Sequence, residues 1–168
     1  WQSLKPNWEA ILNDFVEPHL YDISIAKNGV ITLIGEFEMV LRSKDMGESW
    51  QIVHKGDSSL FSLHYADALL GYAVGQNGRV LKTENGGENW ASVDINSSAN
   101  LLSVWSSMQG EVLISGIRTL LKSTDSALSW SKENNSDISV GWYNGISSSR
   151  KKTTTSDLST NEGKVYAV

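Results

Sequence analysis

The residues whose types and spacing could do chemistry lie in three eight-residue motifs: SKDMGESW (43–50), TENGGENW (83–90) and STDSALSW (123–130). Each motif begins with a hydroxyl residue, carries Asp or Asn two places later, and ends on Trp. Such a set of side chains could form a repeated ligand site, or it could hold a repeated fold together. The closing Trp residues are spaced by 40 residues twice: Trp50, Trp90 and Trp130.

Elementary turn chemistry favours the second interpretation of the motifs. An Asp or Asn side chain can accept hydrogen bonds from backbone N–H groups a few residues on and thereby close a turn. The Gly that follows supplies a backbone conformation with positive φ, and a Trp folded back between sheets would bury roughly 150–250 Å². We therefore predict a structural role for these residues: Ser43, Asp45, Gly47, Trp50, Thr83, Asn85, Gly87, Trp90, Ser123, Asp125 and Trp130. Ala127 replaces the Gly in the third motif.

The sequence between the motifs has the periodicity of short strands. Runs such as YDISIA (21–26) and FSLHYA (61–66) are rich in β-branched and aromatic residues and are bounded by turn residues. Each unit predicts four antiparallel strands, with repeats at about 21–50, 61–90 and 101–130. Four strands in about 40 residues are typical of a propeller blade. The predicted fold class is therefore all-β, a β-propeller or part of one with about 40-residue blades.

The motifs also resemble a known family. The pattern Ser/Thr-x-Asp-x-Gly-x-x-Trp is similar to the Asp-box, or BNR repeat, of sialidases and related propellers, and SKDMGESW matches it at every defined position. The run GYAVGQNGRVLKTENGGENW (71–90) resembles the repeat of the photosystem II stability/assembly factor family. That resemblance implies a scaffold that binds other proteins during assembly, without catalysis. It also favours an extracytoplasmic or virion-associated location, although the sequence leaves the compartment open.

Enzymatic alternatives find little support in the sequence. A sialidase-type site implies three arginines that grip a carboxylate, and the chain has four arginines: Arg42, Arg79, Arg118 and Arg150. Arg42 is predicted to occupy a solvated outer position, which leaves a triad without any supporting motif. Other glycosidases need two carboxylates across a cleft, for which Glu36 with Glu38, or Asp14 with Glu17, could be considered. Because the chain has 19 acidic residues, such pairs arise readily on a solvated surface, and we predict no catalytic residue.

Composition excludes several other classes of site. The chain of 168 residues has no cysteine, and His19, His54 and His64 lack the close spacing of metal ligands. No Gly-rich loop follows a strand and opens a helix, so we predict neither a metal nor a cofactor. The formal charge of −5 argues against nucleic acid as a partner. No apolar run reaches the roughly 18 residues of a membrane span.

Two groups of residues are candidates for binding. The first strands of a propeller line its central channel, where aromatic side chains could stack on a sugar or fill a pocket of a partner; packing in the core is the alternative. These candidates are His64, Tyr65, Trp105, Trp142 and Tyr143. The second group, Arg150, Lys151 and Lys152, lies in a polar insertion (147–163) that is expected to form a flexible loop and could dock an acidic partner.

The two ends of the chain resemble parts of blades. Partial blades are predicted at 1–12, where NWEAIL resembles a last strand, and at 137–168. Within the second, DISVGWYNG (137–145) resembles a first strand and GKVYAV (163–168) a second. The chain is thus expected to be a single propeller domain or fragment over 1–168, closed within itself, by a second copy, or by sequence outside it.

The function that this sequence favours is a non-enzymatic, protein-binding scaffold in assembly or within a larger particle. The first alternative is a carbohydrate-binding propeller of the adhesin type. A sialidase-like glycoside hydrolase is the second alternative.

Overall fold

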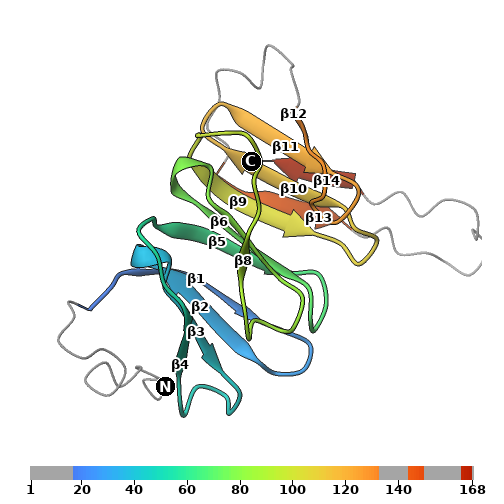
Figure 1. Cartoon of the computed structure of the whole chain (residues 1–168). Coiled ribbons are helices and arrows are strands. Elements are labelled where there is room, and N and C mark those ends of the chain that lie inside the picture. The colour runs from blue at the N-terminus through green and yellow to red at the C-terminus, as the bar shows by residue number, and fades with distance from the viewer. Residues whose placement is uncertain (1–16, 133–143, 150–163, 168) are drawn as a thin grey trace, which may run out of the picture.

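The computed structural model describes residues 17–132, 144–149 and 164–167. They form strands joined by turns, with two short 3-10 segments, η1 (Glu36–Glu38) and η2 (Gln76–Gly78). Three four-stranded sheets and one two-stranded sheet follow one another along the molecule (Figure 1). The prediction of an all-β fold that forms part of a propeller is confirmed.

Each four-stranded sheet keeps its strands in chain order and pairs them antiparallel. The first sheet contains β1 (Leu20–Ile25), β2 (Ile31–Gly35), β3 (Val40–Ser43) and β4 (Gln51–His54). The second contains β5 (Leu60–Tyr65), β6 (Gly71–Gly75), β7 (Val80–Thr83) and β8 (Ala91–Ser92). The third contains β9 (Leu101–Ser106), β10 (Val112–Gly116), β11 (Thr119–Ser123) and β12 (Ser131–Lys132). The fourth contains β13 (Ile146–Ser149) and β14 (Lys164–Ala167).

The last hairpin differs from the expectation for the C-terminal part. The first strand of the fourth sheet is β13, whereas the sequence placed it at 137–145 and assigned 147–163 to a loop. The loop assignment is therefore wrong for residues 147–149, and most of 137–145 lies outside the described residues. The small, polar sequence ISSS has no alternation of apolar side chains, which explains why it did not signal a strand. The expected partial blade at 1–12 also lies outside the described part of the chain.

The first strands of successive sheets are linked by a repeated hydrogen bond. The backbone N–H of Leu63 in β5 donates to Asp22 Oδ2 of β1 at 2.7 Å. The N–H of Val104 in β9 donates to Ser62 Oγ at 3.3 Å, and the N–H of Ile146 in β13 donates to Ser103 Oγ at 3.1 Å. Each first strand thus accepts a hydrogen bond from the next first strand through a side chain at the same place in the repeat.

Hydrophobic clusters fill the space between the sheets. One cluster joins Ile34 and Val40 of the first sheet to Leu60 and Leu63 of the second. Another joins Tyr72 and other residues of the second sheet to Val104 and Ile114 of the third. A glycine that ends each second strand permits close approach of the chain: a β-carbon at Gly35, Gly75 or Gly116 would overlap the carbonyl oxygen of His19, Ser59 or Asn100.

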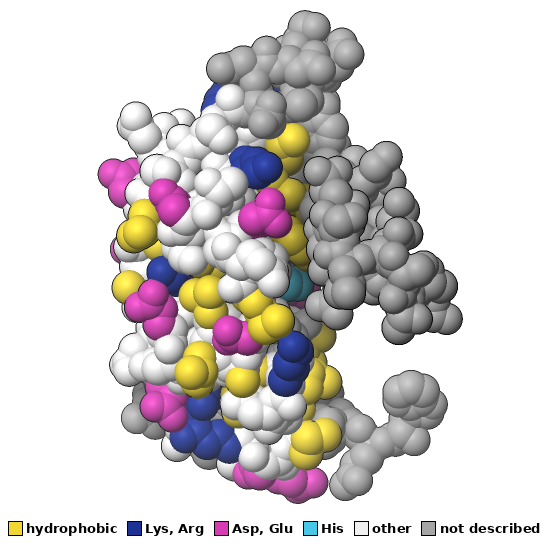
Figure 2. Space-filling model, turned by 90° about the vertical axis from the view of Figure 1, so that its right-hand side faces the viewer, with side chains coloured by type: hydrophobic (Ala, Val, Ile, Leu, Met, Phe, Trp, Pro, Cys, Tyr) yellow, Lys and Arg dark blue, Asp and Glu magenta, His cyan; other side chains and the backbone are white. Residues whose placement is uncertain are grey.

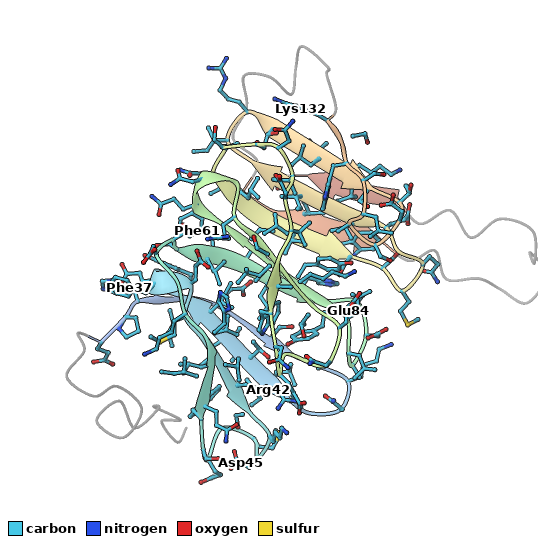
Figure 3. All side chains as sticks on the ribbon, viewed as in Figure 1. Phe37, Arg42, Asp45, Phe61, Glu84 and Lys132 are labelled. Carbon is cyan, nitrogen blue, oxygen red and sulfur yellow. The ribbon has the colours of Figure 1, made fainter. Side chains whose placement is uncertain are left out.

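The turns of each sheet fall on two opposite sides of the molecule. The motif face carries the turns between third and fourth strands (44–50, 84–90 and 124–130), and the linker face carries η1, η2 and the connections between sheets. Phe37 and Phe61 lie on the linker face, and Glu84 lies on the motif face (Figure 3). None of the helical segments among the described residues is long and apolar enough to cross a membrane.

Candidate functional site

The first motif forms a compact turn held by its own side chains. Ser43, the last residue of β3, accepts a hydrogen bond from the N–H of Gly47 at 2.8 Å and donates its hydroxyl to Asp45 Oδ1 at 2.8 Å. The N–H of Ser49 donates to the same Asp45 oxygen at 2.9 Å. The hydroxyl and the carboxylate are therefore both engaged in closing the turn.

The other two motifs repeat this network. Thr83 Oγ1 accepts from the N–H of Gly87 at 2.9 Å, and Asn85 Oδ1 accepts from the N–H of Asn89 at 3.0 Å. In the third motif Ser123 Oγ accepts from the N–H of Ala127 at 2.9 Å, and the N–H of Ser129 donates to Asp125 Oδ1 at 2.9 Å. An amide oxygen in the second motif thus does what a carboxylate oxygen does in the others.

Ala127 adopts the turn that glycine makes elsewhere. Its φ is +71°, against +92° at Gly47 and +78° at Gly87. A left-handed backbone conformation costs an L-residue roughly 1–2 kcal/mol. The third motif therefore keeps its geometry although its sequence lacks the glycine.

The hydrogen bonds of the turns lower the pKa values of the two motif carboxylates, Asp45 and Asp125. Hydrogen bonds from the side chain and backbone of Ser49 and from Ser43 lower the pKa of Asp45 to about 2. The corresponding bonds from Ser129 and Ser123 lower the pKa of Asp125 to about 2. Both groups are ionised at neutral pH, which suits an acceptor in a turn and does not suit a general acid.

The three motif Trp residues lie at equivalent places but are buried to different extents. Trp90 is 9% exposed and packs in the cluster between the first and second sheets, whereas Trp50 and Trp130 are half-buried. Their indole Nε1 atoms are buried and have no hydrogen-bond partner among the described residues. The Trp positions therefore use the shape and apolar surface of the ring.

Arg42 does not occupy the solvated position that was predicted for it. Its side chain is 7% exposed, its Nε donates to the carbonyl oxygen of Gly86 at 2.8 Å, and its Nη1 lies 3.5 Å from Glu88 Oε1. Gly86 and Glu88 belong to the second motif, so Arg42 joins the first sheet to the motif turn of the second sheet. Arg42 and Asp45 lie at the same end of the first sheet (Figure 3).

Two of the binding candidates on first strands, Tyr65 and His64, lie at boundaries between sheets. Tyr65 faces the first sheet: its hydroxyl is 3.0 Å from Thr32 Oγ1, and its ring makes an edge contact with Trp90 at 6.2 Å between centroids. Burial raises the pKa of Tyr65. Because these groups engage one another, Tyr65 acts in packing at this boundary.

His64 faces the third sheet. The N–H of Ser106 donates to His64 Nδ1 at 3.1 Å, and Ser106 Oγ lies 2.9 Å from the same nitrogen. Because a backbone N–H can only donate, Nδ1 is unprotonated, and burial lowers the pKa of this imidazole. Trp105 lies beside it, with 6.4 Å between the ring centroids. The other binding candidates lie outside the described residues: Trp142, Tyr143, Arg150, Lys151 and Lys152.

An ion-pair cluster on the linker face was missed by sequence reasoning. Glu38, whose side chain is 3% exposed, accepts from Arg79 Nε at 2.7 Å and lies 3.1 Å from His54 Nε2. A β-carbon at Gly56 would lie 2.5 Å from its carboxylate carbon. Glu36, which could be considered with Glu38 as a carboxylate pair, lies 3.1 Å from His19 Nδ1.

A signal for this cluster exists in the alignment of the repeats. Glu38 occupies the place of Gly78 in the second repeat, and both have positive φ, +47° and +73°. A glutamate in a left-handed conformation at a glycine position is strained. The burial of Glu38 and its pairing with Arg79, 41 residues away, accompany that strain.

Arg79 borders a polar hollow of about 350 Å³ on the linker face. Its Nη1 donates to Ser92 Oγ at 3.0 Å, and its side chain remains 35% exposed. Residues that line the hollow are mostly polar: Ser58, Gln76, Asn77, Gly78, Arg79, Ser92, Val93, Asp94, Ile95 and Ser97. The hollow offers hydroxyl, amide and charged groups to a ligand.

The motif face has a different character. Figure 2 turns this side toward the viewer and shows hydrophobic side chains dispersed among acidic and basic ones. Exposed apolar residues in its turns are Met46, Leu69, Met108 and Leu128. Within the described ranges, no group of three or more His, Asp or Glu side chains could hold a metal ion.

Solved structures with the same fold include two YCF48 proteins. The structure "YCF48 bound to D1 peptide" matches with a TM-score of 0.64 at 17% identity, over 77% of this chain and 43% of that one. YCF48 from Cyanidioschyzon merolae matches with a TM-score of 0.60 at 15% identity, over 81% and 48%. An ancestral GH74 enzyme matches with a TM-score of 0.64 at 22% identity, over 76% and 20%. At these identities the matches show the fold alone, and the chain spans less than half the length of each.

Sequence comparison identifies the family. No curated protein sequence matches the chain. The family model described as "Photosynthesis system II assembly factor YCF48" matches residues 53–168, well over half of the chain. This protein therefore belongs to the family of the photosynthesis system II assembly factor YCF48.

Proposed function

We propose that the protein is a non-enzymatic scaffold that binds a peptide segment of a partner protein during assembly. The observation that carries this proposal is membership in a family of assembly factors. A YCF48 structure of the same fold is described as bound to a D1 peptide. A propeller of this kind would hold an exposed segment of its partner on one face.

The hollow on the linker face is the proposed contact for the peptide. Glu38 and Ser92 each fix one nitrogen of Arg79, so the guanidinium group has a defined orientation before any ligand binds. Such pre-organisation lowers the entropic cost of binding. The amides of Gln76 and Asn77 border the same hollow and can donate to and accept from the main chain of an extended peptide.

The absence of catalysis is part of the proposal. The motif carboxylates are engaged in turns, and Glu36 and Glu38 have separate partners, His19 and Arg79. These arrangements support a binding role, since a glycosidase needs two carboxylates free to face one substrate.

A peptide-binding experiment tests the proposal. The intact chain would be screened against an array of peptides from candidate partners, and affinities would be measured for the peptides retained. Arg79→Gln removes the oriented cation, and Gln76→Trp fills the hollow without touching the ion pair. Both variants should weaken binding at least tenfold, whereas Lys132→Gln, a matched loss of charge on exposed β12, should not.

Other outcomes of this experiment contradict the proposal. Binding that Gln76→Trp leaves unchanged would place the peptide elsewhere. Retention of glycans in place of peptides would support the carbohydrate-binding alternative, and turnover of fluorogenic glycosides would support a hydrolase. Thermal melting of each variant verifies that the fold is intact.

A further inference from the structure

The hollow on the linker face carries one side chain of each charge. Among the described residues that line it, Arg79 is the only basic residue and Asp94 the only acidic one. The two do not pair with each other, because Glu38 is the carboxylate partner of Arg79. Both charges therefore border the hollow separately, and each can meet a group of opposite charge on a ligand.

The guanidinium group of Arg79 keeps donors for such a ligand. An arginine side chain has five N–H donors. Two of them are used here, one by Glu38 Oε1 and one by Ser92 Oγ. The others, including both on Nη2, have no partner among the described residues. A ligand carboxylate can therefore bind the outer side of the group without breaking the bonds that hold it.

Asp94 presents a carboxylate that is held at one oxygen. The backbone N–H of Asn96 donates to Asp94 Oδ1 at 2.8 Å, which orients the side chain. Within the described part of the chain, Oδ2 has no hydrogen-bond partner. Because Asp94 is exposed, a cationic group of a ligand can approach Oδ2 from solvent.

The first repeat fills the corresponding place with its own side chains. His54 corresponds to Asp94 and Glu38 to Gly78, 40 residues earlier in each case. In the first sheet His54 Nε2 lies 3.1 Å from Glu38 Oε2. In the second sheet Gly78 has no side chain that could contact Asp94. The second repeat thus leaves open to a ligand a place that the first repeat closes with a side-chain pair.

The spacing of the two charges fits an extended peptide. Ser92, which holds Arg79, and Asp94 are two residues apart, so their α-carbons are at most about 7 Å apart. In an extended peptide the side chains at positions i and i+2 point to the same side and are separated by nearly the same distance. One acidic and one basic side chain at that spacing can therefore reach Arg79 and Asp94 together.

We propose that the hollow selects peptides that carry an acidic and a basic side chain two positions apart, and that Asp94 is the residue that selects the basic one. This inference rests on the proposed peptide-binding function and adds the charge pattern of the ligand to it. The acidic side chain of the peptide lies against Arg79, and the basic side chain lies against Asp94 Oδ2. A peptide with two acidic side chains at this spacing is rejected, because one of them would face Asp94.

Pairs of peptides that differ only in the basic residue test the inference. For each array peptide whose binding Gln76→Trp weakens, a second form has Gln in place of the basic residue, and both forms are titrated against wild type and Asp94→Asn. Asp94→Asn removes the charge and keeps an oxygen that accepts from Asn96. It should weaken binding of the basic form about fivefold, as loss of a partly shielded ion pair does, and should leave binding of the Gln form unchanged.

Charge reversal and a matched control complete the experiment. Asp94→Lys should make the protein prefer peptides with an acidic residue in place of the basic one. Glu48→Gln removes a negative charge from an exposed position on the motif face. This control should leave the affinities for both peptide forms unchanged, which separates contact in the hollow from the effect of net charge.

The outcomes distinguish this inference from the proposed function. If peptides bind in the hollow but Asp94→Asn leaves the affinity for the basic form unchanged, the charge pattern is wrong and peptide binding stands. An equal loss for the basic and Gln forms would also overturn the inference, because Asp94 would then act through the shape of the hollow. Failure to retain any peptide would overturn both proposals. Thermal melting of each variant verifies that the fold is intact.

Discussion

The hydroxyl group of Tyr65 lies against the α-carbon of Gly87, so closely that a β-carbon on Gly87 would overlap it. The two residues sit at the boundary between the first and second sheets, where Tyr65 also contacts Thr32 and Trp90. The motif glycine is therefore required by two constraints: its positive φ of +78° and the approach of a neighbouring ring.

Gly87→Ala is predicted to destabilise the fold by about 1–3 kcal/mol, because it adds a strained φ and a steric overlap. Chemical denaturation measures the change. In the double variant with Tyr65→Phe, which removes the overlapping oxygen, the loss should be smaller than the sum of the two single losses. If the losses in the free energy of unfolding from the two substitutions add strictly, the contact between Tyr65 and Gly87 does not affect stability.

Ala127→Gly is predicted to stabilise the protein by about 1 kcal/mol. Ala127 already has φ of +71°, and glycine adopts this region without the steric cost that alanine incurs. The gain is reduced by the greater freedom of glycine in the unfolded chain. A lower denaturation midpoint than wild type would contradict the assignment of strain to this turn.

Trp90→Ala should lower the free energy of unfolding by roughly 3–5 kcal/mol, the range for large aromatic residues in cores. Trp90 is the most buried of the three motif Trp residues. Trp50→Ala and Trp130→Ala should cost less, since their rings are half-buried. A Trp90→Ala protein that melts within a degree or two of wild type would refute the packing role.

Acid stability should depend on Asp45 and Asp125, whose folded-state pKa values are about 2. Because these values lie below the ordinary 3.8, the stability that the two groups contribute is present above pH 4. It is lost as the pH falls from about 4 toward 2. Asp45→Asn should be mild at pH 7, because Asn85 makes the same turn bonds, and should flatten the acid profile. An unchanged profile in the double Asn variant would contradict this origin.

His64 should make the boundary between the second and third sheets sensitive to pH. Burial lowers its pKa, and the charge of Asp22 opposes that shift in part. Its stabilising contribution is full above the ordinary pKa of about 6.5 and is lost as the pH falls below it. Urea unfolding at pH 7.5 and pH 5.5 measures the difference, which His64→Gln should reduce. Equal pH dependence in both proteins would exclude His64 as its source.

The repeated motifs predicted the strands and their order because each motif encodes a local turn. The hydroxyl, the Asp or Asn and the Trp all act within one turn and its strand, so their spacing carries the information. The first strand of the last sheet escaped prediction, because the sequence ISSS lacks apolar alternation.

Contacts between sheets could not be predicted in the same way. Arg42 was expected in solvent because the other repeats have lysine there. Its side chain is instead buried and donates to the carbonyl oxygen of Gly86, 44 residues away. Glu38 and Arg79 are 41 residues apart, and His64 and Ser106 are 42 apart. Partners across a boundary between sheets are therefore separated by one repeat of 40 residues plus one to four further residues.

This separation of about one repeat also bears on cooperativity. Hydrogen bonds between sheets join immediate neighbours, as in Asp22 with Leu63 and Ser62 with Val104. The free energy of unfolding of such an array is approximately the sum of an intrinsic term for each sheet and an interaction term for each junction between neighbouring sheets. The second and third sheets each have two junctions within the described part of the molecule, and the first and fourth sheets each have one. Amide protons should therefore exchange faster in the first and fourth sheets than in the second and third, so that the molecule opens from its ends.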